Sequence, residues 1–429
     1  MTQLFATLEL LRQLTSFESV AGNLSQQQAL AQWLEDWLVD EVDAQVVCPV
    51  SAQPADKFPP LVHVRVDIGA PETVVLYNTY DVTPAAVEDG WEVDPFVGGL
   101  SHRADKGDIF IARGAENNKG PLAGMLMVLR DLHHAGQLHT NLEILLEGEE
   151  QTGSGHLRRY LAGTPCPVEP AQAVLFPSLC EYGGGAPRIY LGFNGLSTGR
   201  VCVRQASQGE SAATIPAGNA AWIADRASGV LQTQPLDEEA VQLLADLVRN
   251  VNFNDELRFR RGEAIVTGDT FNYLSGLLTG AMLSVADLTR LPHAAPAVIP
   301  GQSCAELALR TPPGMDAEAL LQRICQRLRN PDFEDITLKP GDSYPGYRFS
   351  QEDAGVLELM ASYHQQQARP QIWPWAPDCA PACAFAPIAP AFVIGGLGEG
   401  GNARGVNEFV TLRGLRRYQR SIRDWLLAF

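Results

Sequence analysis

The sequence predicts an α/β fold with a mostly parallel central sheet, into which a second, smaller unit is inserted. Three observations predict it: a length of 429 residues, alternating strand and helix patterns in the first part, and a change of pattern from about Arg188. A chain this long exceeds one compact domain, so two domains are expected. The predicted division assigns 1–187 and 346–429 to a discontinuous first domain and 188–345 to the inserted domain.

The first domain is predicted from the spacing of its apolar residues. Helical spacing covers Thr2–Thr15, Leu24–Leu38 and Pro121–Ala135, and a further helix is expected after Ser154. Short apolar runs that favour strands lie at Ala44–Val47, Leu61–Val66, Thr73–Leu76, Ile109–Ala112, Leu142–Leu146 and Ala173–Phe176. A long loop rich in Gly, Asp and Pro is expected over Asp81–Gly107. Strands and helices in alternation favour a mostly parallel sheet.

The inserted domain is predicted as a β-α-β-β-α-β unit, the ferredoxin-like order. Its expected elements are a strand at Gly199–Arg204, a helix at Ala220–Val230, strands at Thr270–Leu274 and Ala305–Arg310, a helix at Asp316–Leu328 and a strand at Ile336–Lys339. The chain then returns to the first domain with helices at Asp353–Gln366 and Leu412–Leu427, and a strand at Ala391–Gly395.

Charge and composition exclude several classes of partner. The net charge is 32 − 50 = −18, which argues against nucleic acid and anionic membrane surfaces as partners. No apolar run approaches the roughly 18 residues of a membrane span, and the N-terminus lacks the pattern of an export signal. Eight cysteines scattered through such a chain are expected to be reduced thiols in the cytoplasm, without a disulfide framework.

Six short segments then point to a known family. They read YNTYDVTP (77–84), GWEVDPF (90–96), ARGAENNKGP (112–121), EGEEQTGS (147–154), VIPGQSCAELALR (298–310) and GGNARGVNEF (400–409). In this order and spacing the chain resembles the dizinc aminoacylase–dipeptidase family, which includes acetylornithine deacetylase, succinyl-diaminopimelate desuccinylase and carnosine dipeptidase. The resemblance implies a catalytic α/β domain built from both chain ends and an inserted lid that often mediates dimerization, so a homodimer is expected by analogy.

The resemblance also implies a mechanism. Family members hold two zinc ions that activate a shared water, and a glutamate next to a metal ligand serves as general base. Here Glu149 falls at the general-base position and Glu150 at a ligand position. Asp81 corresponds to the aspartate that orients a metal-binding histidine, and is retained as a catalytic residue.

The other metal positions are changed. Thr79 and Arg404 stand where the family has histidines, Asn117 replaces the bridging aspartate, and Ser178 aligns with an acidic ligand. An amide brings no negative charge to a dication, and a guanidinium cannot ligate a metal. Because four of the five ligand positions differ, we predict no zinc centre and no other cofactor. The polar replacements are expected to line a ligand-binding cleft.

Two lid residues match family positions that contact the substrate's carboxylate end, Asn272 and Arg310. A turn or strand-end role for Asn272 and a structural ion pair for Arg310 are the alternatives. The family's lid histidine has no counterpart between Gln205 and Trp222. Cysteines 180, 379 and 383 lie near the implied site, and a nucleophilic or metal-binding role is open for them. Because no histidine lies in their segments, buried thiols are the favoured interpretation.

Three functions are compatible with this pattern. The favoured one is a family member without dizinc hydrolysis whose polar cleft binds a small peptide-like or N-acyl amino-acid ligand. The second is an active amide hydrolase or acyl-transfer enzyme that uses Glu149 as base with one metal or none. The third is a structural partner of an active paralogue.

Overall fold

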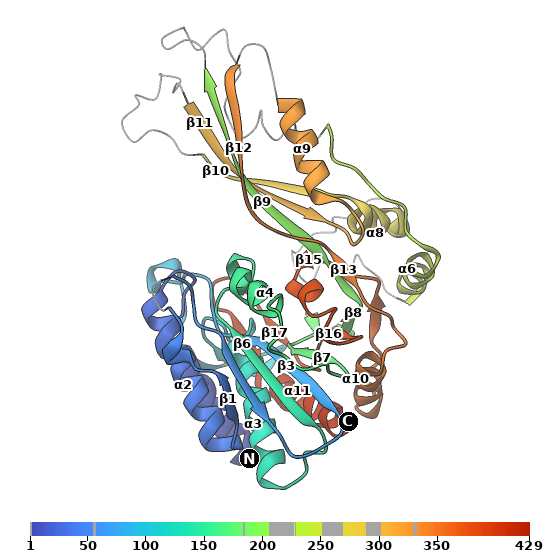
Figure 1. The fold of residues 1–429 in the computed structure, drawn as a ribbon. Coiled ribbons are helices and arrows are strands. Elements are labelled where there is room, and N and C mark those ends of the chain that lie inside the picture. Colours follow the sequence, from blue (N-terminus) through green and yellow to red (C-terminus); the bar gives the residue numbers. More distant parts are fainter. Residues whose placement is uncertain are drawn as a thin grey trace.

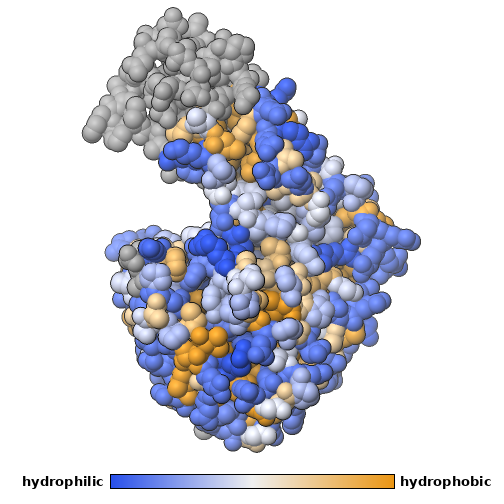
Figure 2. All heavy atoms as spheres, viewed as in Figure 1, coloured by the Kyte–Doolittle hydropathy of each residue, from blue (hydrophilic) through white to orange (hydrophobic). Residues whose placement is uncertain are grey.

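The computed structural model describes residues 2–54, 57–182, 185–205, 227, 229–250, 269–288, 302–328 and 333–429. These residues form a broad α/β part that carries both ends of the chain and a narrower, extended part above it (Figure 1). The surface outline is hollowed on one side, where the upper part leans over the lower (Figure 2).

The lower part is built on a mixed central sheet in the order β1-β2-β6-β3-β7-β16. Its strands are β1 (Gln45–Cys48), β2 (Val62–Val66), β6 (Asn141–Glu147), β3 (Thr73–Thr79), β7 (Val174–Pro177) and β16 (Phe392–Gly395). The last four run parallel, whereas β1 and β2 are antiparallel to their neighbours. The predicted mostly parallel α/β sheet is therefore confirmed.

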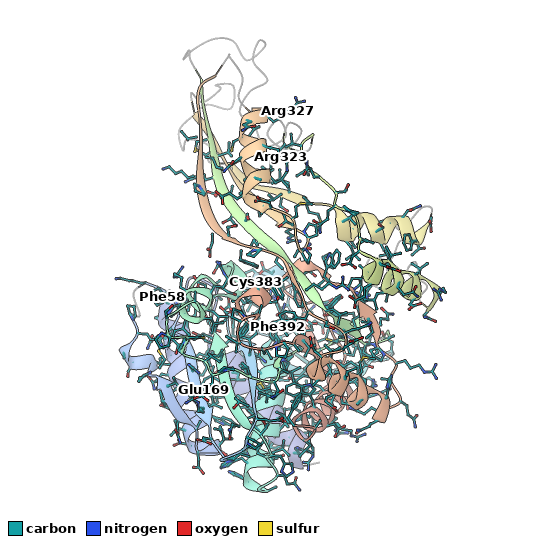
Figure 3. All side chains as sticks on the ribbon, turned by 45° about the vertical axis from the view of Figure 1, so that its right-hand side comes forward. Phe58, Glu169, Arg323, Arg327, Cys383 and Phe392 are labelled. Atoms are coloured by element: carbon teal, nitrogen blue, oxygen red, sulfur yellow. A yellow bond between two sulfur atoms is a disulfide. The ribbon has the colours of Figure 1, made fainter. Side chains whose placement is uncertain are left out.

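Alternate residues of the central strands face two separate layers, as strand geometry requires. Val74 and Leu76 of β3 belong to one hydrophobic cluster, whereas Val75 and Tyr77 belong to another. The first cluster contains the helices α1 (Thr2–Ser16), α2 (Leu24–Val42), α3 (Lys119–His134), α10 (Ala354–Gln365) and α11 (Leu412–Leu426). The second contains α4 (Gly155–Leu161) and the aromatic side chains of residues 373–392, among them Phe392 (Figure 3).

A small antiparallel sheet lies beside this layer, in the order β17-β18-β5-β4. It consists of β17 (Gly400–Gly401), β18 (Phe409–Thr411), β5 (Gly107–Ile111) and β4 (Gly99–Arg103). β5 overlaps the strand predicted at Ile109–Ala112, whereas β4 lies inside Asp81–Gly107, so the prediction of a continuous loop there is wrong. Because β17 and β18 pair with each other, the segment 402–408 between them forms a closed turn, which holds Arg404 and Glu408.

The upper part has a four-stranded antiparallel core in the order β10-β11-β9-β12. Its strands are β9 (Gly192–Gln205), β10 (Met282–Leu288), β11 (Gln302–Thr311) and β12 (Phe333–Tyr344), and α9 (Ala317–Leu328) packs against it. In chain order this is 2-3-1-4, and the helix between the third and fourth strands is as predicted. The helix expected at Ala220–Val230 lies almost wholly outside the described residues.

One predicted strand is wrong. Residues 270–274 begin the helix α8 (Thr270–Thr279), and the second strand of the unit is β10 instead. The side chain of Asp269 accepts a hydrogen bond from the backbone N–H of Phe271 and so caps the helix. A helix α6 (Glu238–Asn250), absent from the prediction, packs against α8. The division at 188 and 346 remains a prediction.

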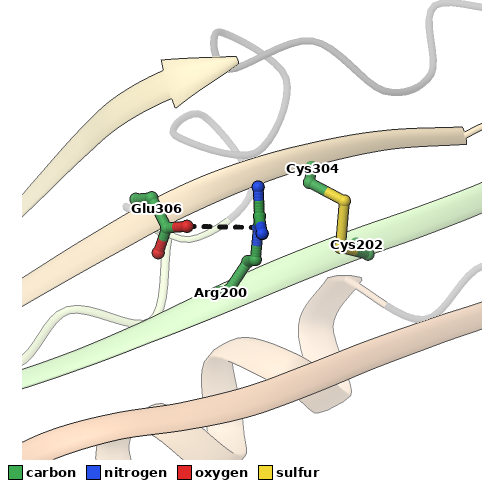
Figure 4. The surroundings of a disulfide bond; sticks show 4 residues. All are labelled: Arg200, Cys202, Cys304 and Glu306. Atoms are coloured by element: carbon green, nitrogen blue, oxygen red, sulfur yellow. Dashed lines mark ion pairs between the residues drawn. A yellow bond between two sulfur atoms is a disulfide. The ribbon is translucent and has the colours of Figure 1, made fainter. Parts of the chain in front are cut away.

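The cysteines also require a correction. Cys202 of β9 and Cys304 of β11 are directly opposite residues of two paired strands, and they form a disulfide across 102 positions of sequence (Figure 4). On the same strands Arg200 pairs with Glu306, with 3.1 Å between Nε and Oε1. The expectation that all eight cysteines are reduced fails because strand pairing juxtaposes two residues far apart in sequence. The other six cysteines form no disulfide.

Within the described ranges, no helix combines the length and apolar character that crossing a bilayer requires.

Candidate functional site

The predicted site residues follow the carboxyl ends of three neighbouring parallel strands. β3 ends at Thr79, β6 ends at Glu147 just before Glu149 and Glu150, and β7 ends at Pro177 just before Ser178. Ligand sites of parallel α/β sheets lie at this edge. The turn 402–408 brings Arg404 to the same place from the far end of the chain.

Glu150 and Arg404 form an ion pair at the surface of the site. The guanidinium Nη2 lies 3.3 and 3.2 Å from Oε1 and Oε2 of Glu150. The Glu150 side chain is 16% exposed and that of Arg404 is 49% exposed. Burial raises the pKa of Glu150, Arg404 lowers it, and the nearby Asp378 raises it further. Of the five positions that the resemblance implies for metal ligands, only Glu150 has a carboxylate, and that carboxylate is paired with Arg404.

Glu149 is half-buried beside this pair and is held by the start of α4. Its Oε2 accepts a hydrogen bond of 2.6 Å from the backbone N–H of His156. The same carboxylate has no second hydrogen-bond donor in the described part of the chain. One oxygen atom is therefore left to accept a proton, as a general base requires.

Asp81 is fully buried and only partly satisfied. Its Oδ2 accepts a hydrogen bond of 2.9 Å from the backbone N–H of Gln151, whereas Oδ1 has no partner among the described residues. Burial, followed by the charge of Glu150, raises the pKa of Asp81 to about 7. The family resemblance implies a histidine beside Asp81, at the position where this chain has Thr79. The backbone N–H of Thr79 donates a hydrogen bond of 2.7 Å to the side chain of Asn78. The orphaned oxygen is what loss of that histidine would leave.

Beneath the surface, Glu408 organises the turn that carries Asn117. Glu408 is 0% exposed, and Arg113 donates from Nη1 to its Oε2 at 2.7 Å. The backbone N–H groups of residues 114, 116 and 117 also donate to this carboxylate, at 3.1, 3.1 and 2.8 Å. Burial raises the pKa of Glu408, and these donors oppose the rise. The Asn117–Asn118 peptide in this turn is cis.

A second buried network joins the ends of β3 and β7. The Asn118 amide donates to Asn78 Oδ1 and to the Pro177 carbonyl, each at 2.8 Å. Ser178 Oγ donates to Asn118 Oδ1 at 3.2 Å. The side chains of Asn78, Asn118 and Ser178 are thus joined in one network, with Asn118 at its centre.

The two lid residues are placed differently. Arg310 ends β11 near the site, with its Nη1 4.0 Å from Oδ1 of Asp378, the residue that raises the pKa of Glu150. Asn272 is exposed on α8, and no hydrogen bond joins it to the other site residues in the described part of the chain. The segment 206–222, where the family's lid histidine is missing, lies outside the described residues.

The three nearby cysteines are buried or half-buried thiols. Burial raises the pKa of Cys180 to about 12 and that of Cys379 to about 12, and it also raises the pKa of Cys383. Cys383 lies where the lower and upper parts meet (Figure 3). Because the thiolate is the reactive form, these environments disfavour a nucleophilic role.

These residues do not fit a pair of zinc ions. The donor set at the five positions is two hydroxyls, an amide, a guanidinium and one carboxylate already paired with that guanidinium. Among the described residues, no three His, Cys, Asp or Glu side chains gather as a metal-binding group. The arrangement can instead offer charge-assisted hydrogen bonds to a small polar ligand.

The sequence prediction missed the buried residues that position the site. Asn78, Asn118 and Glu408 all stand inside the quoted segments: the first two are directly beside Thr79 and Asn117, and Glu408 is four positions after Arg404. Only the fold shows that Asn118, and not its neighbour Asn117, is the fully buried member of that pair.

Comparison with known proteins agrees with this geometry. The sequence model of "Peptidase family M20/M25/M40" matches residues 75–428. The Cys-Gly metallodipeptidase DUG1 of Candida albicans is 38% identical over 86 residues, 20% of this chain and 17% of that protein. The human Beta-Ala-His dipeptidase is 36% identical over 83 residues, 19% of this chain and 15% of that protein. The matched stretches are thus less than a fifth of either relative's length.

Solved structures match over almost the whole chain. An M20 family metallo-carboxypeptidase from Sulfolobus solfataricus superposes with a TM-score of 0.81 at 20% identity, covering 98% of both chains. The dipeptidase Dug1p from Saccharomyces cerevisiae gives 0.79 at 19% identity, covering 100% of this chain and 98% of that one. At these identities the likeness concerns the fold. With the sequence match over residues 75–428, the chain belongs to peptidase family M20/M25/M40.

Proposed function

We propose that this chain has lost dizinc hydrolysis and uses its cleft to bind a small peptide-like or N-acyl amino-acid ligand. One observation carries the proposal: the Arg404 guanidinium lies within 3.3 Å of both carboxylate oxygens of Glu150. A fixed cation at this point would repel a divalent metal and would itself supply positive charge to a ligand.

The charges of the cleft suit a ligand with an amine and a carboxylate. Arg404 is half exposed, so one edge of its guanidinium is open to a ligand carboxylate, and Arg310 offers a second cation from the lid. Glu149 and Glu150 supply negative charge for an amino group. The dipeptidase relatives act on small peptides by their names, which supports this ligand class.

The test begins with metal. Elemental analysis of protein purified without chelator, followed by calorimetric titration with zinc, should give no bound metal and no binding heat. The quadruple variant Thr79→His, Asn117→Asp, Ser178→Glu and Arg404→His restores the family's ligand types and should acquire zinc binding. One or two tightly bound zinc ions in the unaltered chain would overturn the proposal.

Ligand binding is tested separately. Dipeptides and N-acyl amino acids should bind in calorimetry without being cleaved, and Arg404→Gln should weaken their binding at least about tenfold by removing a charge-assisted hydrogen bond. Lys in place of Arg404 serves as the control that keeps the charge.

In the alternative function, the chain is an active enzyme. The oxygen of Glu149 that lacks a donor favours this alternative, an amide hydrolase or acyl-transfer enzyme with Glu149 as base and one metal or none. Turnover that disappears in Glu149→Gln, and survives in His156→Ala, would establish it. The role of structural partner to a paralogue would be supported by a stable hetero-oligomer and no ligand binding.

Cytoplasmic location and homodimer formation through the lid belong to the same proposal. The bridge between Cys202 and Cys304 opposes the first, because disulfides are rare in reducing compartments. Thiol titration of denatured protein from the native source would give eight free thiols in a reducing compartment and six otherwise, since eight cysteines are present and two are bridged. Light scattering would give the assembly state.

A further inference from the structure

A cavity of about 350 Å³ lies between three helices of the lower part, away from the sheet edge that carries the candidate site. Helices α1 and α11 both pack on α3, and the cavity is where their surfaces diverge. Its lining consists of Gln3, Leu4, Val128, Asp131, Arg416, Gln419, Arg420 and Arg423. The volume falls within the range of small-molecule sites.

Three arginines of one helix converge on this cavity. Residues 416, 420 and 423 are four and three positions apart, so they share one face of α11. Arg416 and Arg420 have no hydrogen bond or ion pair in the described part of the chain. Arg423 donates to Gln137 Oε1 at 2.7 Å, a neutral partner. Burial raises the pKa of Asp424 on the same helix, and the nearby charges of Arg420 and Arg423 lower it, but no ion pair joins it to either guanidinium in the described part of the chain.

The one acid in the lining is already occupied. Asp131 accepts a hydrogen bond of 2.6 Å from Gln3 and another of 3.2 Å from Arg130. The lining residues carry a charge of +2, three arginines less one aspartate, in a chain whose net charge is −18. Such a local reversal of sign attracts anions to this place while the rest of the surface repels them.

The three helices also connect the cavity to the candidate site. α3 begins beside Asn118 and carries Asp131 roughly 20 Å further along its axis. Lys119, at the start of α3, donates from Nζ to the carbonyls of Leu14 and Phe17 at 2.9 and 2.8 Å, which ties α3 to the far end of α1. α11 starts directly after the strand that follows Glu408. α1 and α3 thus each have one end at the cavity and the other near the site, and the cavity residues of α11 begin in its second turn.

We propose that this cavity is a second ligand site, for a small multivalent anion that carries phosphate groups or several carboxylates. Guanidinium groups bind both through paired, charge-assisted hydrogen bonds. The site is independent of the proposed function of the cleft, since none of its lining residues belongs to the cleft.

Calorimetric titration at low ionic strength with pyrophosphate and, separately, with citrate tests the proposal and distinguishes the two anion chemistries. We expect one site per chain for at least one of the two anions. The double variant Arg416→Gln and Arg420→Gln should weaken that binding at least about tenfold. The control pair Arg323→Gln and Arg327→Gln removes the same charge from α9 in the upper part, far from the cavity (Figure 3), and should change affinity less than about twofold.

A second measurement needs no variant. Amide hydrogen exchange of the unaltered chain with the bound anion should slow in the first turns of α1 and in the second halves of α3 and α11. Absence of binding by both anions at millimolar concentration would overturn the proposal. So would equal weakening in the control pair, or protection confined to the segments 147–156 and 402–408 of the cleft.

Discussion

The candidate site has a buried layer, here called its floor, and an exposed layer, its rim, and the two hold their charged residues in different ways. On the floor, Glu408 is inaccessible and receives four donors, one of them Arg113. On the rim, Glu150 is paired with a half-exposed Arg404, at longer distances. Floor contacts set the backbone of the turn that carries Asn117, whereas rim contacts join side chains alone. The chain thus has the fold of its family, and the proposed changes of function lie in the exposed layer of the site.

The floor should be the most sensitive part. Glu408→Gln would turn an amide N–H₂ toward donors that now meet a carboxylate, and would leave Arg113 buried without its partner. We expect a loss of about 3–5 kcal/mol in the free energy of unfolding, measured by urea denaturation. The same change at Glu92, which pairs with Arg103 at the surface, should cost less than about 1 kcal/mol. Equal losses in the two variants would remove the distinction between floor and rim.

Asp81 is fully buried, and its titration should make the free energy of unfolding depend on pH. Its pKa is raised from 3.8 to about 7 in the folded chain, so the folded state keeps a proton that the unfolded state has released between these values. The free energy of unfolding therefore falls as pH rises from about 4 to about 7 and then levels off. Asp81→Asn should gain on the order of 4 kcal/mol relative to the parent at pH 8 compared with pH 4, since each pKa unit corresponds to about 1.4 kcal/mol.

The control for this titration is Asp105→Asn, in the exposed turn before β5, which should leave the difference between parent and variant constant across the same range. A flat difference for Asp81→Asn would mean that the buried carboxylate finds compensation elsewhere.

A substitution of Asn118 tests the second buried network of the floor, where a smaller loss of stability is expected. Asn118→Ala removes two donors of 2.8 Å and the acceptor of Ser178 Oγ, and the carbonyl of Pro177 keeps only the Asn78 amide at 3.3 Å. We expect a loss of about 2 kcal/mol in thermal or chemical denaturation. Asn250→Ala breaks one exposed bond to the Asp246 carbonyl and should cost less than about 0.5 kcal/mol.

The rim should respond least in stability. Arg404→Gln breaks a pair whose guanidinium is 49% exposed, so unfolding should change by less than about 1 kcal/mol. Its effect should appear instead in ligand affinity. A stability loss as large as that of Glu408→Gln would show that Arg404 serves the fold and would remove the main support for a ligand role.

The spacing of apolar residues predicted the helices and strands that bury one face or both faces. The helices α1, α2, α3, α9, α10 and α11 and the parallel strands of the central sheet fall within a few residues of their expected positions. α8 was missed because TFNYLSG combines aromatic and β-branched residues typical of strands, while the capping Asp269 just before it was given no weight. Local preference there is overridden by the cap and by packing against α6.

The site was predictable only in part. Resemblance located Thr79, Asn117, Glu149, Glu150, Ser178 and Arg404, and the structure brings their segments to one sheet edge. The pairing of Arg404 with Glu150 spans 254 positions, and that of Arg113 with Glu408 spans 295. No local pattern encodes such distances, and nor does any pattern encode the partner of Cys202. Side-chain direction also decides which of two neighbouring residues faces inward, and a single sequence does not give it.

The bridge between Cys202 and Cys304 also determines how the chain would respond to being cut. A protease that cleaves once between these two cysteines leaves two fragments joined through sulfur. They would separate on an electrophoresis gel only after a reductant is added. The first fragment would carry Cys202 with most of β9 and the second Cys304 with most of β11, strands that pair over ten consecutive residues. A molecule cleaved once in this segment could thus be purified as one species. The cleavage would be detected only after the disulfide is reduced.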